Sequence, residues 1–330
     1  MLPIEDHRLR SLFDPYLLAL VAAVVLASFA PVRGDAAVLA GVATNVGIAL
    51  LFFLYGARLP REAIIAGLVH WRLHLTVLTC TFVLFPLLGF VVLPMARPWL
   101  TDELAFGVLF LCALPSTVQS SIAFTAIARG NVAAAVCSAS LSNLLGVFLT
   151  PLLVSLMVAT HGDTTSPLDA VGKIALLLLA PFVCGHALRP LLAGFVERRR
   201  HLLAISDRAT VLLVVYVAFS ASVAEGLWQR VSPMALVVVG IVALVLLALV
   251  LFATQAAGRL LGFARGDTIA LVFCGSKKSL ASGVPIAKVL FAGDPMIGVI
   301  LLPIMLFHQL QLIACAMLAQ HWSRQAADRG

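Results

Sequence analysis

Ten apolar runs, each long enough to cross a lipid bilayer as a helix, constrain the fold of this chain more than any other feature. Crossing the hydrocarbon core takes about 20 helical residues. We therefore expect membrane spans at 15–32, 37–57, 72–93, 103–128, 132–158, 168–190, 205–224, 233–256, 268–291 and 296–319. Only 11% of the 330 residues are charged, whereas a typical soluble domain has about 25%. The sequence predicts an all-α integral membrane protein that is embedded in the lipid bilayer.

The positive charges favour one orientation of these spans. With ten spans and a cytoplasmic N-terminus, the cytoplasmic segments hold roughly three times as many Arg and Lys residues as the external ones. This bias follows the positive-inside rule and predicts that both termini are cytoplasmic. The Arg- and Ala-rich composition suggests a bacterial inner (plasma) membrane. Pro31 directly follows the small-residue site at Ser28-Phe-Ala30, so the first run is expected to be a helix and not a cleaved signal peptide.

Composition and motifs disfavour several other classes of function. The sequence has no HExxH, no Gly-x-Ser-x-Gly and no Walker A lysine, so we do not expect an enzyme. Its six cysteines lie in or beside apolar runs without a CxxC motif, which argues against a zinc site or a disulfide framework, and no cofactor is expected. The net charge of +7 is spread over the loops. Topology explains this charge better than a nucleic-acid partner does.

Two adjacent lysines, Lys277 and Lys278, lie near the middle of the ninth run. An ammonium group at the centre of a bilayer costs roughly 2.5–3.5 kcal/mol, so such residues usually face water, a partner or a ligand. On an unbroken helix the two side chains would point about 100° apart, but Gly275 and Pro285 favour a break there. We expect one lysine to cap the C-terminal carbonyls of a half-helix, where the helix dipole favours a cation. The other is expected to face a substrate cavity, and the sequence leaves open which lysine does which.

The ninth run has a counterpart in the fourth. Both carry a polar cluster at mid-span, then Ser-[Ile/Leu]-Ala and Ile-Ala-[Arg/Lys], and each is the fourth span of a five-span half. Because five is an odd number, the halves 1–160 and 161–330 would be inverted relative to each other in the membrane. Matching, interrupted polar spans indicate the binding site of a secondary transporter. The candidate site residues at the two interruptions are Ser116, Thr117, Gln119, Ser120, Ser121, Ser276, Lys277, Lys278 and Ser279.

Spans five and ten contribute further polar candidates. Those in span five either line a ligand path or join helices through hydrogen bonds, and they are Ser138, Ser142 and Asn143. Those in span ten either pack between helices or relay protons, and they are His308, Gln309 and Gln311. All 15 acidic residues are expected at span ends or in loops. With no carboxylate at mid-membrane to pair with the lysines, the natural counter-charge is a small-molecule organic anion.

Three stretches resemble the bile acid:sodium symporter family, and within it the branch around the seventh member of the human solute carrier ten group. They are IALLFFLYGAR at 48–58, LPSTVQSSIAFTAIARGN at 114–131 and CGSKKSLASG at 274–283. The resemblance implies two inverted five-helix repeats, arranged as a panel domain (spans one, two, six and seven) and a core domain. Spans four and nine would cross at unwound centres, and transport would use alternating access. Relatives in this superfamily carry bile acids and other organic anions with sodium.

The sequence departs from the sodium-coupled members of that family at the crossing. Their span-four Ser-Asn corresponds to Ser121-Ile122 here, and their span-nine glutamate and glutamine are missing from Phe273–Lys278. A nearby ammonium would repel sodium, so our hypothesis is that a lysine replaces a bound sodium ion. Coupling would then use protons or exchange, or be absent. If sodium does bind, the candidate ligands are Ser120, Ser121 and Ser276.

The sequence therefore predicts a secondary active transporter of an organic anion, bile-acid-like or another carboxylate or sulfonate. One alternative is a sodium-coupled symporter of the bile acid family, which would use hydroxyls and carbonyls without a carboxylate. Another is a non-transporting regulator of ion homeostasis. Substrate identity and oligomeric state are not readable from the sequence.

Overall fold

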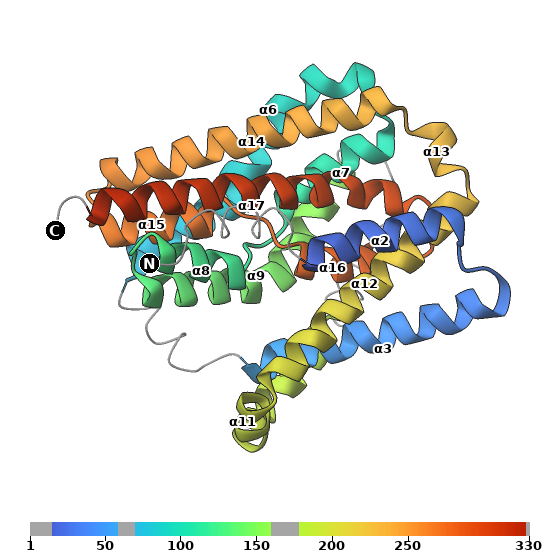
Figure 1. Ribbon diagram of the computed structural model, residues 1–330, viewed down its shortest axis with the longest axis horizontal. Coiled ribbons are helices and arrows are strands. Elements are labelled where there is room, and N and C mark those ends of the chain that lie inside the picture. Colours follow the sequence, from blue (N-terminus) through green and yellow to red (C-terminus); the bar gives the residue numbers. More distant parts are fainter. Residues whose placement is uncertain (1–14, 59–69, 160–177, 328–330) are drawn as a thin grey trace, which may run out of the picture.

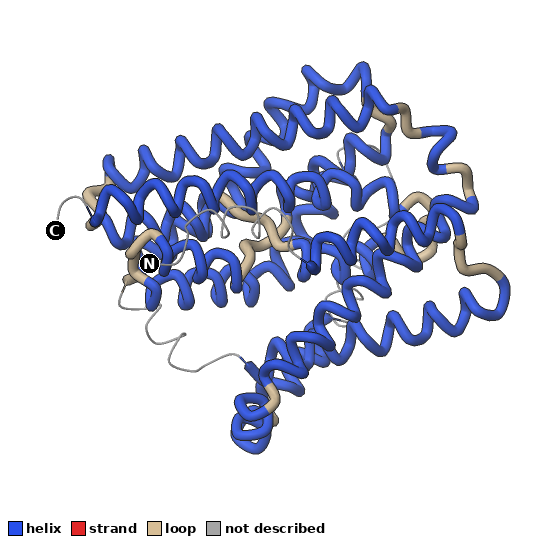
Figure 2. Tube along the Cα trace, in the orientation of Figure 1, coloured by secondary structure: helices blue, strands red, loops and turns tan. Residues whose placement is uncertain are grey.

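The computed structural model describes residues 15–58, 70–159 and 178–327, and within these ranges the regular structure is helical, without strands (Figures 1 and 2). The N-terminal 14 residues and the predicted boundary between halves at 160/161 lie outside the described residues. The first half contains α2 (Pro15–Phe29), α3 (Gly34–Arg58), α5 (Trp71–Thr79), η1 (Cys80–Leu84), α6 (Phe85–Ala96), η2 (Arg97–Trp99), α7 (Asp102–Ala113), α8 (Gln119–Ile127) and α9 (Val132–Ala159). The second contains a helix over Leu178–Ala187, then α11 (Arg189–Arg198), α12 (Arg200–Ala224), α13 (Leu227–Arg230), α14 (Pro233–Leu260), α15 (Arg265–Gly275), α16 (Leu280–Leu290) and α17 (Ile297–Ala327).

The described helices make this a multi-pass membrane protein. By length and composition, six of them can cross a membrane, and a seventh span results if the bent pair Leu178–Ala187 and Arg189–Arg198 counts as one. The two members of that pair are bent by 90°. Other predicted spans coincide with the short helix α2 and with two interrupted helices, so helix length alone does not give the predicted ten.

Both interruptions fall where the sequence has its mid-span polar clusters. The fourth predicted span consists of α7 and α8, and residues 114–118 between them are not helical. Leu114 is extended (φ −75°, ψ 154°), as expected for a residue before proline, and Pro115 has no N–H to continue the helix. The ninth span consists of α15 and α16, with the break at 276–279, while Pro285 lies inside α16. Figure 2 shows loop segments inside the body of the molecule as well as at its ends.

The helices pack in two groups that meet along α12. In one group α12 packs against α2 and α3, and in the other α17 packs against α7 and α8 while α9 packs against α15 and α16. Helix α3 crosses the helix over Leu178–Ala187 at two glycines. A Cβ at Gly56 would lie 1.9 Å from the carbonyl oxygen of Phe182, and one at Gly185 would lie 1.9 Å from that of Phe53. Only glycine allows these two backbones to approach so closely.

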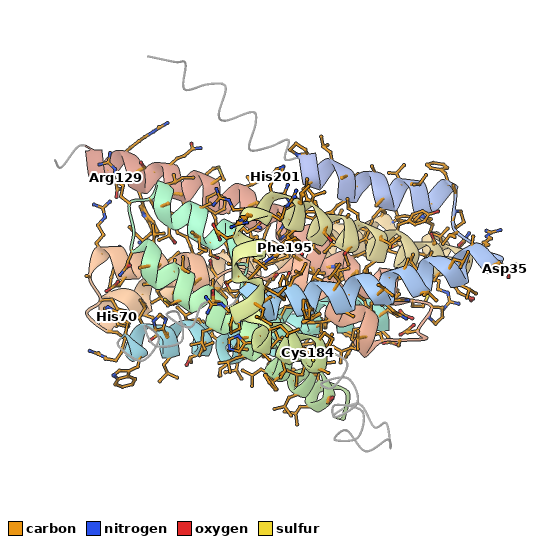
Figure 3. All side chains as sticks on the ribbon, turned by 90° about the horizontal axis from the view of Figure 1, so that it is seen from below. Asp35, His70, Arg129, Cys184, Phe195 and His201 are labelled. Atoms are coloured by element: carbon orange, nitrogen blue, oxygen red, sulfur yellow. The ribbon has the colours of Figure 1, made fainter. Side chains whose placement is uncertain are left out.

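The turns at the two ends of the molecule are well separated. Figure 3 shows Asp35, at the start of α3, at the opposite end from His70 and Arg129. Arg129 has a positive φ of 57° in the turn between α8 and α9, a conformation that few residues other than glycine adopt. Asn131, two residues after Arg129 and directly before α9, donates through its side chain to Asp267 at 2.7 Å, which joins this turn to the start of α15.

Candidate substrate site at the crossing of two interrupted helices

The two interruptions touch each other through the main chain. The Ser279 amide donates to the Pro115 carbonyl oxygen at 2.8 Å. The Ser121 hydroxyl, in the first turn of α8, donates to the Phe273 carbonyl near the end of α15, also at 2.8 Å. Polar segments at least 152 residues apart in the sequence therefore meet inside the molecule, where each supplies hydrogen bonds that the other has lost by unwinding.

Amide side chains from α9 and α17 hold the unwound segments in place. Asn143 on α9 donates to the carbonyl of Ser116 at 2.6 Å and accepts a hydrogen bond from Ser282 at 2.7 Å. Gln311 on α17 accepts from the Lys278 amide and donates to the Lys278 carbonyl, both at 2.8 Å. Each helix thus satisfies backbone groups at the interruption in its own half of the chain.

Lys278 binds the carbonyl ends of other helices and not those of its own. Its ammonium nitrogen, Nζ, donates to the carbonyls of Cys112 and Leu114, at the C-terminal end of α7, at 2.8 and 2.7 Å. A third bond goes to Thr81 at 2.7 Å. Because Phe85 N–H bonds to Cys80 five residues back, the Thr81 carbonyl is released from the helix ladder and can accept it. The side chain is fully buried.

Lys277 is equally buried but its ammonium has different surroundings. Nζ lies 3.9 Å from the centroid of the Phe124 ring and 5.6 Å from that of Phe273. Within the described ranges no hydrogen-bond acceptor reaches it, and the same is true of the neighbouring Ser276 hydroxyl. An aromatic face stabilises a cation by about 0.5–2 kcal/mol, which offsets only part of the cost of burying an ammonium group.

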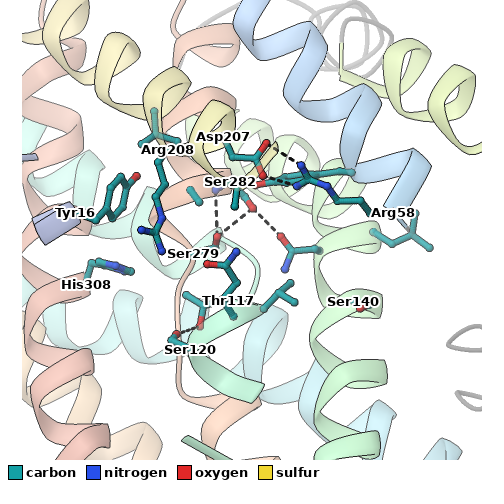
Figure 4. A pocket seen from close by; sticks show the side chains of 18 of the residues that line it. Tyr16, Arg58, Thr117, Ser120, Ser140, Asp207, Arg208, Ser279, Ser282 and His308 are labelled. Atoms are coloured by element: carbon teal, nitrogen blue, oxygen red, sulfur yellow. Dashed lines mark hydrogen bonds and ion pairs between the residues drawn. The ribbon is translucent and has the colours of Figure 1, made fainter. Parts of the chain in front are cut away.

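A cavity of about 370 Å³ lies between the two groups of helices, beside the crossing (Figure 4). Its apolar wall includes Leu144, Val147, Phe182, Val211 and Leu312. Its polar wall comes from the interruptions and from helices α2, α3, α8, α9, α12, α16 and α17. It consists of Tyr16, Tyr55, Arg58, Thr117, Gln119, Ser120, Ser140, Asn143, Asp207, Arg208, Ser279, Ser282 and His308.

Positive side chains outnumber negative ones in the wall of this cavity. Arg58, in the last turn of α3, forms an ion pair with Asp207 on α12. Arg208 follows Asp207 directly, and its guanidinium carbon Cζ lies 5.5 Å from the centroid of the Tyr16 ring. No carboxylate in the described parts of the chain pairs with Arg208. Leaving His308 aside, two arginines and one aspartate give the cavity a net formal charge of +1.

Comparison with known proteins identifies the family. The SBF-like CPA transporter family matches residues 14–324. The chain belongs to this family. It is 57% identical over 321 residues to a protein of Pseudomonas aeruginosa (97% of this chain, 96% of the relative). It is 51% identical over 319 residues to the putative symporter YfeH of Escherichia coli (96% and 95%), and 27% identical over 295 residues to sodium/bile acid cotransporter 7 of Xenopus tropicalis (86% and 84%).

These matches confirm the resemblance to the bile acid:sodium symporter family and show that the protein is a transporter and not an enzyme. Its cavity contains only some of the residues that the sequence predicts for the site. Those lining it are Thr117, Gln119, Ser120, Asn143, Ser279 and His308. Those outside its lining are Ser116, Ser121, Ser138, Ser142, Ser276, Lys277, Lys278 and Gln309.

Four residues in the second set form hydrogen bonds at the crossing itself, and they are Ser116, Ser121, Ser142 and Lys278. The Ser142 hydroxyl accepts from the Ser116 amide at 3.0 Å. Ser138 lies away from the crossing and is 2.8 Å from Nδ1 of His74 on α5. Of the two lysines, Lys278 binds the carbonyls at the end of α7, and neither lysine lines the cavity.

Sequence reasoning missed the charged residues of the transporter's cavity. The positive-inside rule counts Arg58 and Arg208 among the cytoplasmic charges, and Asp207 is one of the acidic residues expected at span ends or in loops. Helix α12, however, begins at Arg200, so Asp207 and Arg208 lie about two turns inside it. The signal that could have found them is the pair of charged residues Asp207 and Arg208, which lies about two turns inside an apolar helix.

In the part of the chain that the structure describes, no group of three or more His, Cys, Asp or Glu side chains could hold a metal ion.

Proposed function

We propose that this protein is a secondary transporter that moves an organic anion by alternating access. Its architecture would be ten helices in two inverted five-helix repeats, with α2, α3, the bent pair and α12 as the panel. The matching positions of Asn143 and Gln311, each holding the interruption of its own half, support this arrangement. So does the reciprocal packing of α9 on α15 and α16, and of α17 on α7 and α8.

The electrostatics of the cavity favour an anionic substrate. Arg58 neutralises Asp207, and Arg208 adds a positive charge that no carboxylate of the described residues compensates. Residues at the N-terminal ends of α8 and α16 line the same cavity, and the N-terminus of a helix carries partial positive charge. The apolar wall suits a substrate that has a hydrophobic body as well as a charged group.

The proposal about the ion that drives transport rests on Lys278. Three main-chain carbonyls around one point form the kind of site that binds sodium, and here they surround an ammonium group of this chain. A covalently attached cation cannot be exchanged with the solution. The transporter is therefore expected to work without sodium at this position, with protons, exchange or no coupling ion instead.

Thermal unfolding of the purified protein tests this idea. Sodium chloride is compared with choline chloride at constant ionic strength, for the wild type and for Lys278→Ala and Lys277→Ala. We expect no sodium effect on the wild type or on Lys277→Ala. Lys278→Ala opens the carbonyl site and should gain stabilisation by sodium.

A strong sodium-specific stabilisation of the wild type would instead support a sodium-coupled symporter. Uptake of labelled organic anions into proteoliposomes, with and without a sodium gradient, separates both cases from a non-transporting regulator. A regulator would show no uptake under either condition.

A further inference from the structure

Arg58 and Asp207 in the cavity wall pair with each other, whereas Arg208 has no ion-pair partner among the described residues. It is exposed to the cavity space. Figure 4 shows its side chain extending from α12 past Tyr16, toward the part of the cavity framed by His308 and Ser279. No carboxylate among the described residues pairs with this guanidinium, so it is available to an anion that enters the cavity.

The neighbouring carboxylate is already engaged. Asp207 is one residue away on the same helix, where side chains point about 100° apart. Both of its carboxylate oxygens face the guanidinium of Arg58, which reaches across from α3. Arg58 therefore prevents Asp207 from capturing Arg208 or from repelling an incoming anion.

Tyr16 lies beside Arg208, whose Cζ is over the Tyr16 ring at 5.5 Å from the ring centroid. A cation over an aromatic ring is stabilised by the negative face of the ring. A guanidinium group is planar and its five N–H donors point outward in that plane. Two of these donors can form parallel hydrogen bonds to an oxyanion.

We propose that Arg208 anchors the substrate by binding its carboxylate or sulfonate group in a two-point contact. The hydrophobic body of the ligand then lies on the wall formed by Leu144, Val147 and Leu312. The ligand class is an amphipathic organic monoanion. This inference rests on the proposed anion transport, and it assigns the charge recognition to α12 and not to the two lysines.

Ligand-induced thermal shifts test the anchor directly. The probes are 2-naphthoate and cholate, each compared with its uncharged methyl ester, together with an anionic lipid, phosphatidylglycerol, in mixed micelles. The variants are Arg208→Gln and Arg208→Lys. The matched control is Arg230→Gln, because Arg230 is also exposed and lies on α13, outside the cavity lining.

We expect the soluble anions to stabilise the wild type and Arg230→Gln, and the esters not to do so. Arg208→Gln should weaken anion binding at least about tenfold, since a charge-assisted bidentate contact is lost. Arg208→Lys should recover only part of it, because lysine keeps the charge without the fork.

Three outcomes would overturn the inference, and they separate it from the proposed function. Equal binding by the wild type and Arg208→Gln removes the anchor but leaves anion transport standing. Stabilisation only by phosphatidylglycerol makes the ligand a lipid. If neither soluble anion binds the wild type more tightly than its ester does, both proposals fail.

Arginine modification gives a second measurement that does not depend on the stability of a variant. Phenylglyoxal is reacted with the wild-type protein, and adducts at Arg208 and Arg230 are quantified by mass spectrometry. The soluble anions should slow modification of Arg208 severalfold and leave Arg230 unchanged. Equal protection of both residues, or of neither, would contradict a specific site at Arg208.

Discussion

Lys277 and Lys278 are adjacent and equally buried, yet their ammonium groups have opposite energetic environments. Lys278 satisfies three carbonyls that the end of α7 and the turn at Cys80–Leu84 leave without partners. Lys277 contacts aromatic rings and has no hydrogen bond within the described residues. Lys277 therefore destabilises the fold, whereas Lys278 stabilises it.

Replacement of each lysine by methionine separates these roles, because methionine keeps the apolar stem and removes the charge. Lys278→Met leaves three buried carbonyls unpaired and should lower the free energy of unfolding by about 3 kcal/mol or more. Lys277→Met should be neutral or stabilising by up to about 2 kcal/mol. Thermal unfolding in detergent measures both. Equal losses from the two substitutions would contradict the assignment.

At the level of single residues, the sequence could predict that the lysines matter but not what each one does. Their cost in a bilayer follows from composition alone. Which carbonyls Lys278 reaches depends on a widened helical turn almost 200 residues earlier, at Thr81, and on the Pro115 interruption. No local pattern around Lys278 contains that information.

At the level of elements, the interrupted helices are held by side chains from the neighbouring long helices. All three carbonyls at the end of α7 are bound: Lys278 takes those of Cys112 and Leu114, and Thr150 on α9 donates to that of Ala113 at 2.8 Å. Unwound backbone inside a membrane protein is stable only with such replacements. The sequence predicted both interruptions, since proline and clustered hydroxyls mark them, but not the partners that satisfy them.

Gln311 and Gln309 provide a matched pair on α17. Gln311 is fully buried and binds both backbone groups of Lys278, whereas Gln309 is partly buried and does not line the cavity. Gln311→Met should lower the free energy of unfolding by about 2–3 kcal/mol, because it leaves two buried polar groups unpaired. Gln309→Met should change it by less than about 1 kcal/mol. Thermal or denaturant unfolding compares them, and the opposite order would refute the role given to Gln311.

At the level of the whole molecule, hydropathy predicts the helical class and the charge bias predicts an orientation. Neither pattern could predict the cavity, because the cavity forms between helices that are distant in the sequence. Arg58 and Asp207 are 149 residues apart in the sequence and meet only when α3 packs against α12. Charges of this kind look like ordinary loop charges until the packing is known.

The proposed topology is tested by labelling single cysteines in a Cys184→Ser background, since Cys184 is exposed and the other cysteines are buried. Asp35→Cys and Arg129→Cys place a thiol at opposite ends of the molecule (Figure 3). In spheroplasts, a membrane-impermeant maleimide should label Asp35→Cys at once and Arg129→Cys only after permeabilisation. The background without an introduced cysteine is the control. Equal labelling of both sites in intact spheroplasts would exclude the orientation.

The hydrogen bond from the Ser279 amide to the Pro115 carbonyl has a consequence for how such a protein can change over time. It joins the two interruptions through backbone atoms alone, so at position 279 the contact does not depend on the side chain, whereas Pro115 also makes the break that frees its carbonyl. Mutations can therefore alter the lining of the cavity, and with it the choice of substrate, while the joint between the halves stays intact. The fold separates the part that must be kept from the part that is free to diversify.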